Sequence, residues 1–584
     1  MTLMGNKSVN RVQKSLNGNY VCTCVSSTTN SSCNTLDNCL LFCCCSTSDA
    51  VFCSSMEALT SIEEDAGVSQ IAQFYAGKTI LITGATGFMG KVLVEKLLRS
   101  CAELKAIYLL IRTKKGVEPS VRKEQYFKCV IFSKLLEKNP EIINKVSVVK
   151  GDVLEPNLGL SQNDINTLAS NVEIVFHCAA NVRFDQPLRP MVNMNVVGTL
   201  KLLQLAEKMS QLVALVHVST SYCQCNESVL EERAYAAPQN PFTIIEMVET
   251  MDDAALAEIT PKLLNGLPNT YAYSKALSED LICRYNKKLP IIVTRPSIVT
   301  AAIHEPLPGW IEGVNGPTGL MIGAARGVIR SMHCNPDYAS TVIPVDKAIN
   351  GMILCGYQRA KVATTSQSEV EFCNLCISSK ALMSWGESIE TGRKFFYVTP
   401  LSFALWYPGG SIKRNYFHHM LCVIFLHYLP AYFIDFWLFL FGQKPFLVNV
   451  QRKISTGLKL LQYYTTRDWD FRNERFQQMS SQLNITDQEI FDTSVSQVNW
   501  ETYISNYIRG MRTYILGESD ATIPYAKKVL RRLYILDWVA KILLFTLTFW
   551  FLWTHLDGFV EKSDAFIRSS LQIIYNERNS TLFT

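Results

Sequence analysis

Six short apolar runs between residues 79 and 294, separated by helix-length segments, constrain the fold of this chain most strongly. Apolar runs of about four to eight residues at such spacing predict parallel strands joined by helices that cover both faces of a sheet. We therefore expect a doubly wound α/β domain. The runs are Thr79–Thr83, Ala106–Ile111, Val146–Lys150, Ile174–Cys178, Leu212–Ser219 and Ile291–Thr294.

A glycine-rich turn follows the first run and precedes a predicted helix over Lys91–Leu98. Gly84 permits a tight turn, Gly87 lets the backbone approach a pyrophosphate, and Gly90 lets the helix pack closely on the strand. This order of strand, turn and helix predicts a Rossmann-like dinucleotide site. The residues expected to line it here are Thr83, Gly84, Thr86, Gly87, Phe88, Met89 and Gly90.

The end of the second run favours NADPH over NADH. An NAD enzyme would place a carboxylate there, whereas this chain has Arg112, Lys114 and Lys115, which would attract a 2′-phosphate. The alternative is an ordinary solvated basic loop. Further cofactor contacts are expected after the third and fourth runs, from Asp152, Val153, Ala179 and Asn181.

The catalytic chemistry is predicted from a Tyr-x-x-x-Lys pair. Tyr271 and Lys275 would share one helix face, downstream of the hydroxyl cluster Ser219-Thr-Ser221. The ammonium should lower the pKa of Tyr271 so that it can pass a proton to a carbonyl oxygen. A hydroxyl would bind the same oxygen, with Thr220 or Ser221 favoured. The structural alternative is an amphipathic surface helix.

At 584 residues the chain is long enough for two or three units. The first part is rich in Cys, Ser and Asn and has no signal-peptide pattern, so we expect a disordered leader. After the α/β domain comes an aromatic-rich helical region. The predicted units are a leader at 1–60, a catalytic domain at 70–357, a helical domain at 395–525, a membrane anchor at 533–556 and a tail at 557–584.

Two apolar segments bear on membrane attachment. Residues 420–441, interrupted by Pro430 and Asp435, could form either a buried helical hairpin around Pro430 or a membrane-buried segment. Residues 533–556 are favoured as a membrane anchor because aromatic side chains crowd one end. Basic residues precede this anchor, which predicts that the catalytic domain faces the cytosol.

Composition narrows the function classes. A formal net charge of +5 without a long basic run gives little support to a nucleic-acid partner. Eight of the 19 cysteines lie in the first 53 residues and the rest are scattered, so no disulfide framework is expected. No cysteine or histidine spacing matches a zinc site, and we predict no metal.

Four motifs together resemble the alcohol-forming fatty acyl-CoA reductases of animals and plants, which are extended short-chain dehydrogenases with a helical C-terminal domain. They are Thr83–Gly90, Val218–Tyr222, Pro268–Lys275 and Thr294–Ile298. The likeness covers about residues 70 to 525. It implies Tyr271 and Lys275 as the catalytic pair, with Arg295 and Pro296 among the cofactor-binding residues.

The resemblance also implies a reaction and a setting. Family members reduce long-chain acyl-CoA twice with NADPH, through an aldehyde, to a primary alcohol. Membrane lipid would be a partner, the location would be the endoplasmic reticulum or the peroxisome, and the sequence allows an oligomer.

Two other functions fit parts of the pattern. A membrane-bound sterol or hydroxysteroid dehydrogenase would share the cofactor fold and the Tyr-x-x-x-Lys pair, but the helical domain after residue 395 argues against it. A catalytically inactive dinucleotide-sensing scaffold would have no reason to keep Tyr271, Lys275 and the hydroxyls together.

Overall fold

The computed structural model describes residues 67–362, 369–378, 381–494 and 498–580, together with two short paired strands, β1 (Gln13–Lys14) and β2 (Tyr20–Val21). Residues 69–584 form one compact unit and residues 1–68 another. The predicted leader lies outside the described residues apart from β1 and β2. The domain boundaries predicted within the larger unit stay predictions.

A seven-stranded parallel sheet forms the centre of the larger unit, in the order β13-β9-β7-β6-β3-β4-β5. The chain adds strands outward from β3 on one side and then crosses over to β6 on the other, as in doubly wound folds. This confirms the predicted fold class. The strands are β3 (Thr79–Thr83), β4 (Ala106–Ile111), β5 (Val146–Lys150), β6 (Ile174–His177), β7 (Ala214–Val218), β9 (Ile291–Thr294) and β13 (Glu371–Cys373).

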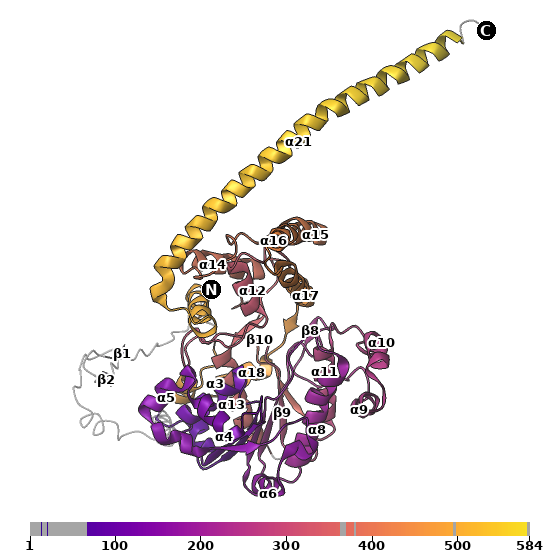
Figure 1. The fold of residues 1–584 in the computed structure, drawn as a ribbon. Helices are drawn as coiled ribbons and strands as arrows, with labels where there is room; N and C mark the ends of the chain where they lie inside the picture. The colour runs from indigo at the N-terminus through magenta and orange to yellow at the C-terminus, as the bar shows by residue number, and fades with distance from the viewer. Residues whose placement is uncertain are drawn as a thin grey trace, which may run out of the picture. The chain divides into compact units, whose positions relative to one another are not determined.

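Helices cover both faces of this sheet (Figure 1). Successive side chains of a strand point to opposite faces. Ile80 and Ile82 accordingly pack in one apolar core, with α3 (Phe88–Ser100) and α13 (Val345–Ala360), whereas Leu81 packs in the other. That second core contains α8 (Gly198–Ala206) and α11 (Thr270–Cys283). Burial on both faces explains why the strands are continuous apolar runs.

Shorter helices complete the α/β part. A π-helical segment, η5, links α7 to α8 without a break. These elements are α2 (Gln70–Tyr75), α4 (Pro119–Phe127), α5 (Ser133–Lys138), α6 (Gln162–Asn171), α7 (Leu188–Val192), η5 (Asn193–Val197), α9 (Pro241–Thr250) and α10 (Asp253–Leu263).

The C-terminal part is helical, as predicted, and three parallel strand pairs connect it internally and to the α/β part. The pairs are β10 (Ile298–Thr300) with β12 (Val342–Pro344), β11 (Ser331–His333) with β14 (Ser411–Lys413), and β8 (Val229–Leu230) with β15 (Asp470–Phe471). The helices are α12 (Pro317–Ala325), α14 (Trp385–Val398), α15 (Tyr416–Val423), η8 (Ile424–Tyr428), α16 (Leu429–Leu440), α17 (Leu447–Thr465), α18 (Glu474–Ser481), α19 (Ile485–Ile490), α20 (Trp500–Gly510), η9 (Met511–Ile515) and α21 (Ile523–Ser580).

The apolar segment 420–441 does not form a buried hairpin. Helices α15, η8 and α16 follow one another without a break. Pro430 closely follows the π-helical segment η8, and the helical run continues through it. Phe433 is 63% exposed and Phe439 is 68% exposed. The interpretation as a buried hairpin around Pro430 is therefore wrong, because the run continues as a helix and presents its aromatic side chains to the outside.

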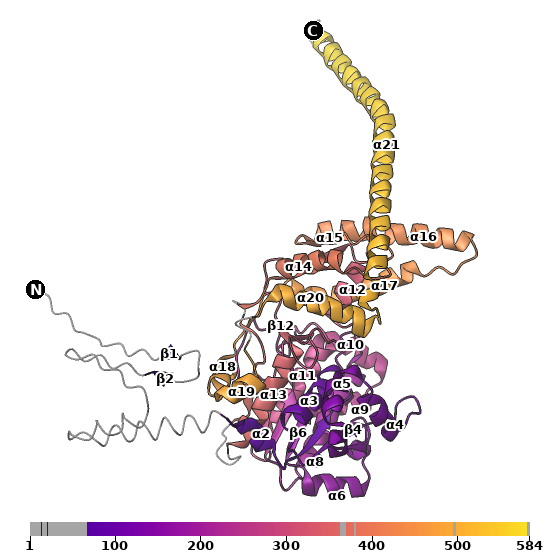
Figure 2. The same ribbon diagram turned by 90° about the vertical axis from the view of Figure 1, so that its left-hand side faces the viewer.

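Helix α21 contains the predicted anchor and projects away from the body (Figure 2). Tyr416–Leu440 and Asp520–His555 are each long and apolar enough to cross a membrane, and both are largely unburied. At the base of α21 the Asp537 carboxylate accepts a hydrogen bond from Trp406 Nε1 at 2.5 Å and forms ion pairs with Arg330 at 3.4 Å and Lys541 at 2.6 Å. The contacts with Trp406 and Arg330 attach α21 at Asp537 to the rest of the unit, whereas Lys541 is a partner within α21 itself.

Candidate active site

The glycine turn leaves no room for side chains at two of its three glycines. Gly84 has φ +73°, and a Cβ there would lie 2.6 Å from Ala179 N. A Cβ on Gly90 would lie 2.6 Å from Ala85 Cα and would overlap the Gly84 carbonyl oxygen. Gly87 is the N-cap of α3 and supplies no side-chain cap, so the N–H groups of the first turn stay available. This cradle fits the pyrophosphate of a dinucleotide.

The side chains of the turn are held by the protein around it. Thr83 Oγ1 lies 2.7 Å from His177 Nδ1 and accepts a hydrogen bond from Ala179 N at 3.2 Å. The Phe88 ring stacks on Trp310 with ring centroids 5.3 Å apart. The predicted residues Thr83 and Ala179 therefore lie together where β3 and β6 end.

Sequence reasoning missed Asn195, which joins the cofactor edge to the catalytic helix. Its Oδ1 accepts a hydrogen bond from Asn181 N at 2.7 Å, and its Nδ2 donates to Asn181 O at 3.0 Å and to Ser274 Oγ at 2.9 Å. Asn195 lies in the π-helical segment η5, and such segments are frequent at functional sites. Nothing in the local sequence marks this π-helix.

At the other end of the site, Arg112 and Asp152 lie close together. Arg112 Nη1 is 3.2 Å from Asp152 Oδ2, and the arginine side chain is 48% exposed. Arg122 donates to the carbonyl oxygen of Arg112. Val153 is buried and would contact any Cβ added at Gly198. Lys115 is exposed on the same loop, with φ 51°. The partly exposed Arg112 and the exposed Lys115 are therefore accessible to a phosphate group of a ligand.

Helix α11, which carries the candidate pair Tyr271 and Lys275, is attached directly to the end of β7. Asn269 Oδ1 caps the helix by accepting from Ala272 N at 3.0 Å. Lys275 Nζ donates to the carbonyl oxygen of Val218 at 2.7 Å. The Thr220 side chain lies close enough to the Tyr271 hydroxyl to lower the pKa of that tyrosine, against the larger effect of burial. The structure thus brings Tyr271, Lys275 and Thr220 together at the carboxyl end of the sheet.

The three hydroxyls after β7 differ in their partners. Ser221 Oγ donates to the Arg295 carbonyl oxygen at 2.7 Å, so its proton is already used. Ser219 Oγ is buried and has no hydrogen-bond partner among the described residues. Thr220 alone of the three interacts with Tyr271 in the part of the chain that the structure describes.

Tyr271 and Tyr273 point in different directions. Tyr271 packs against Phe184, with ring centroids 5.4 Å apart. Tyr273 is fully buried and donates to Gln239 Oε1 at 2.6 Å. Only Tyr271 reaches the hydroxyl cluster, as expected from the helix period.

The electrostatics differ from the expectation that Lys275 lowers the pKa of Tyr271. Burial raises the pKa of Tyr271, and the nearby Thr220 side chain opposes this rise without cancelling it. Lys275 is not among the main influences on that tyrosine. Burial also lowers the pKa of Lys275 to about 8, although Glu279 acts in the opposite direction. Desolvation of both groups therefore dominates in this structure.

The Arg295 side chain is buried in an ion pair within the protein. Its guanidinium is fully buried and forms a two-pronged ion pair with Glu279, with distances of 2.9 Å and 2.7 Å. It also donates to the carbonyl oxygens of Glu231 and Arg233. The guanidinium is therefore held within the protein, and the cofactor contact expected of Arg295 stays a prediction. The backbone of Pro296, whose oxygen accepts from Ser221 N, remains beside the hydroxyl cluster.

Among the described residues, no group of three His, Cys, Asp or Glu side chains is arranged to hold a metal ion. The residues that converge at the carboxyl ends of β3, β6 and β7 are those of a nicotinamide-dependent reductase.

Comparison with known proteins agrees with this geometry. A family model described as "Male sterility protein", of NAD-binding type, matches residues 82–352, and a second model with the same description matches 426–518. Fatty acyl-CoA reductase 1 of Xenopus laevis is 38% identical over 463 residues, covering 79% of this chain and 89% of that protein. The chain belongs to the fatty acyl-CoA reductase family. Fatty acyl-CoA reductase 2 of Bos taurus is also 38% identical, over 80% of this chain and 90% of its own length, and the human reductase 1 is 35% identical over 79% and 89%.

Solved structures support the fold of this reductase family member. The terminal reductase domain of the myxalamid PKS-NRPS pathway has a TM-score of 0.51 at 20% identity, covering 78% of this chain and 98% of that domain. The reductase domain of a nonribosomal peptide synthetase from Mycobacterium tuberculosis gives the same values. At this identity the likeness concerns the fold alone.

Proposed function

We propose that this protein reduces long-chain fatty acyl-CoA with NADPH, through an aldehyde, to the primary alcohol. The observation that carries the proposal is the convergence of Tyr271, Thr220 and Lys275 beside the glycine cradle. Relatives at 35–38% identity named fatty acyl-CoA reductases supply the substrate class. They favour this function over a hydroxysteroid dehydrogenase or an inactive scaffold.

The side chains divide the work in each reduction. When bound, the nicotinamide cofactor supplies hydride to the carbonyl carbon. Thr220 orients the Tyr271 hydroxyl, and the two together hold the carbonyl oxygen. Tyr271 donates the proton that this oxygen takes up. In the first reduction the resulting hemithioacetal then releases the CoA thiol to give the aldehyde, and the second reduction gives the alcohol. Lys275, fixed by the Val218 carbonyl, places a positive charge at the same end of the sheet.

The cofactor preference follows from charge. Arg112 and Lys115 would bind the 2′-phosphate, and Asp152 would remain paired with Arg112. Gly84, Gly87 and Gly90 would hold the pyrophosphate, with Ala179 and Asn181 along the cofactor. NADPH is therefore the cofactor that we assign.

Membrane attachment is the remaining part of the proposal. α21 would cross the bilayer after Asp537, with the basic residues before that point on the cytosolic side. The exposed aromatic face of α15 and α16 would contact lipid. The membrane would be that of the endoplasmic reticulum or the peroxisome.

The test uses the full chain in microsomes from cells that express it. Acyl-CoAs of graded length and NADPH are added, and alcohol, aldehyde and NADPH consumption are measured. We expect the native protein to form the alcohol and to consume two molecules of NADPH for each molecule of alcohol. We expect the Tyr271→Phe variant to form no alcohol. If no acyl-CoA yields either product, or if Tyr271→Phe matches the native protein, the proposal is wrong.

A further inference from the structure

Gly392 is an unexplained glycine in the interior of a helix. It lies in α14, which begins with a complete capping box between Ser384 and Glu387. Glycine is the least favourable residue apart from proline at such a position. The backbone does not require it, because Gly392 is not among the residues with positive φ. The backbone conformation therefore does not explain why position 392 is a glycine.

The neighbours of Gly392 do not require a glycine either. A Cβ at Gly392 would have Met321 Cε, at 3.9 Å, as its only neighbour within 4 Å. Nearby glycines differ: a Cβ on Gly323 would lie 2.6 Å from Ile329 Cδ1, and one on Gly410 would lie 2.5 Å from the Ile329 carbonyl oxygen. Those two glycines are needed for the packing of the protein itself. Gly392 instead keeps open a space that protein atoms do not fill.

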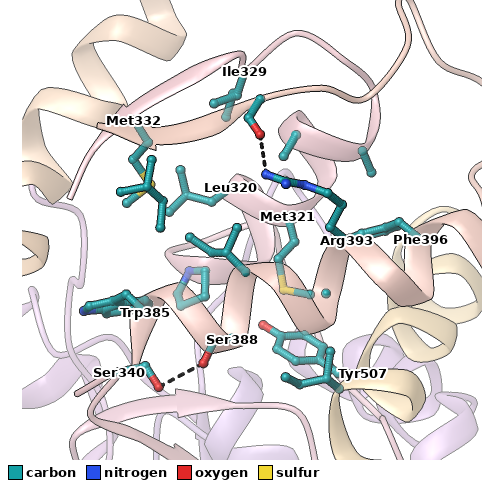
Figure 3. A pocket seen from close by; sticks show the side chains of 18 of the residues that line it. Leu320, Met321, Ile329, Met332, Ser340, Trp385, Ser388, Arg393, Phe396 and Tyr507 are labelled. Atoms are coloured by element: carbon teal, nitrogen blue, oxygen red, sulfur yellow. Dashed lines mark hydrogen bonds between the residues drawn. The ribbon is translucent and has the colours of Figure 1, made fainter. Parts of the chain in front are cut away.

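That space is a cavity of about 170 Å³ between α12, α14 and α20 (Figure 3). Its wall is mostly apolar, with Leu320, Met332, Trp385 and Phe396 among the lining side chains. In the close-up, Met321 and Tyr507 reach toward it from neighbouring helices. An apolar cavity of this kind does not hold water well.

The polar groups of the wall are already paired within the protein. Arg393 Nη2 donates to the Gly410 carbonyl oxygen at 2.6 Å, and Ser388 Oγ lies 3.3 Å from Ser340 Oγ. Tyr503 donates to Thr300 Oγ1 at 2.8 Å. An occupant would therefore find few free hydrogen-bonding partners and would have to be apolar itself.

Residues next to the cavity connect it to the segment that carries Thr220. Thr300, which lines the cavity, ends β10 four residues after Pro296. Tyr222, the last residue of the hydroxyl cluster segment, contacts Thr341 through its hydroxyl. Thr341 stands between the lining residues Ser340 and Val342. The hydrogen bond between Tyr222 and Thr341 thus connects the cavity wall to the segment that carries Thr220.

We propose that this cavity holds the distal part of the fatty acyl chain and that Gly392 sets the length of chain that fits. This inference rests on the proposed function. A side chain at position 392 would occupy the space of the last methylenes and would leave the catalytic groups unchanged. When two substrates differ by one methylene that an apolar pocket can or cannot accommodate, their kcat/KM values differ by about tenfold or more.

The first test compares three variants of the full chain in microsomes. Gly392→Leu fills the cavity, Gly392→Ala adds one methyl group, and Gly457→Leu is the matched control. Gly457 is also a helix-interior glycine, in α17, and a Cβ there would meet nothing within 4 Å. The measurement is the rate of alcohol formation from acyl-CoAs of about 12 to about 20 carbons, in steps of about two, expressed as the ratio of the long-chain rate to the short-chain rate.

We expect Gly392→Leu to lower that ratio about tenfold or more, Gly392→Ala to lower it less, and Gly457→Leu to keep the native ratio. An active Gly392→Leu protein with the native ratio would overturn the inference and leave the proposed function intact. A native protein inactive on every acyl-CoA would instead overturn the proposed function.

A second measurement does not depend on the variants folding. The native protein is irradiated with a palmitoyl-CoA that carries a diazirine at the end of its chain, and the labelled peptides are identified. We expect label on α12 and α14, displaced by excess palmitoyl-CoA. Label confined to α15, α16 or α21, or label that palmitoyl-CoA does not displace, would show that the cavity is not the chain site.

Discussion

Lys275 Nζ donates a hydrogen bond of 2.7 Å to the backbone oxygen of Val218, which attaches the catalytic helix to the strand that carries the hydroxyl cluster. Through this contact Tyr271 and Thr220 share one location although they are 51 positions apart in the chain.

The two tyrosines of α11 should respond differently to loss of their hydroxyls. Tyr271→Phe removes the proton donor and should lower kcat about a hundredfold or more. Tyr273→Phe loses the bond to Gln239 and should cost about 1 kcal/mol of stability with near-native kcat. Steady-state rates and thermal melts measure this, and NADPH fluorescence should show unchanged cofactor binding. An inactive Tyr273→Phe beside an active Tyr271→Phe would refute the assignment.

Cofactor choice should depend on Arg112. Arg112→Glu places a second carboxylate near Asp152 and should weaken NADPH binding by about tenfold or more, with less effect on NADH, because a charged hydrogen bond to the 2′-phosphate is replaced by repulsion. Rates with both cofactors measure the ratio. Equal use of NADH and NADPH by the native protein would contradict this prediction.

The glycine cradle should tolerate side chains unequally. Gly90→Ala would force Cβ against Ala85 and the Gly84 carbonyl, at a cost of about 1–3 kcal/mol, and should shift the turn that holds the pyrophosphate. Gly87→Ala, whose Cβ would lie 3.3 Å from the Gly84 oxygen, should be milder for stability. Thermal melts with and without NADPH distinguish the two variants. Equal melting temperatures would argue against the close packing of α3.

Activity should fall at alkaline pH as Lys275 loses its proton. Burial lowers the pKa of Lys275 from 10.5 to about 8 in the folded chain. Between these values the unfolded chain binds more protons, so this group makes stability rise with pH while the ammonium is lost from the site. The pH profile of kcat/KM should therefore decline above about pH 8, while thermal stability does not fall for this reason. A profile that stays level to pH 10 would contradict it.

The C-terminus should lie in the lumen of sealed microsomes. Lys527, Lys528, Arg531 and Arg532 precede the apolar run and should remain cytosolic. A C-terminal tag should then resist protease until detergent is added, and the Asn579 sequon, whose Thr581 lies outside the described residues, should be glycosylated. Digestion of the tag without detergent would indicate a helix that lies on the surface.

Much of the fold could be predicted because its signals are local. The strands β3, β4, β5 and β9 have the predicted bounds, since burial on both faces makes each a continuous apolar run. The helix period likewise predicted that Tyr271, and not Tyr273, lies on the same helix face as Lys275. The buried hairpin at Pro430 was wrong because the apolar character of a segment does not by itself show whether its side chains are buried in the protein or exposed on the outside.

The features that were missed depend on contacts between distant parts of the chain. Asn195 acts through a π-helical segment that no local pattern marks. Arg295 is expected among the cofactor-binding residues, and its side chain pairs with Glu279, a contact that the sequence does not reveal. The direction of the Tyr271 pKa shift also depends on burial by residues from several elements. The apolar cavity is lined from residue 300 to residue 507 and has no sequence signature.

The anchorage of Asp537 to Trp406 and Arg330 has a mechanical consequence. From Tyr525 to Leu556 the sequence contains no glycine or proline, so the helix has no built-in hinge where it leaves the body. Because α21 is attached to the rest of the protein at Asp537 and has no hinge, the two move together as a rigid body. A bilayer that holds α21 would therefore also fix the tilt and the rotation of the catalytic domain relative to the membrane. The α/β part would then keep the same side toward the lipid surface throughout each turnover, instead of rotating freely about a flexible linker.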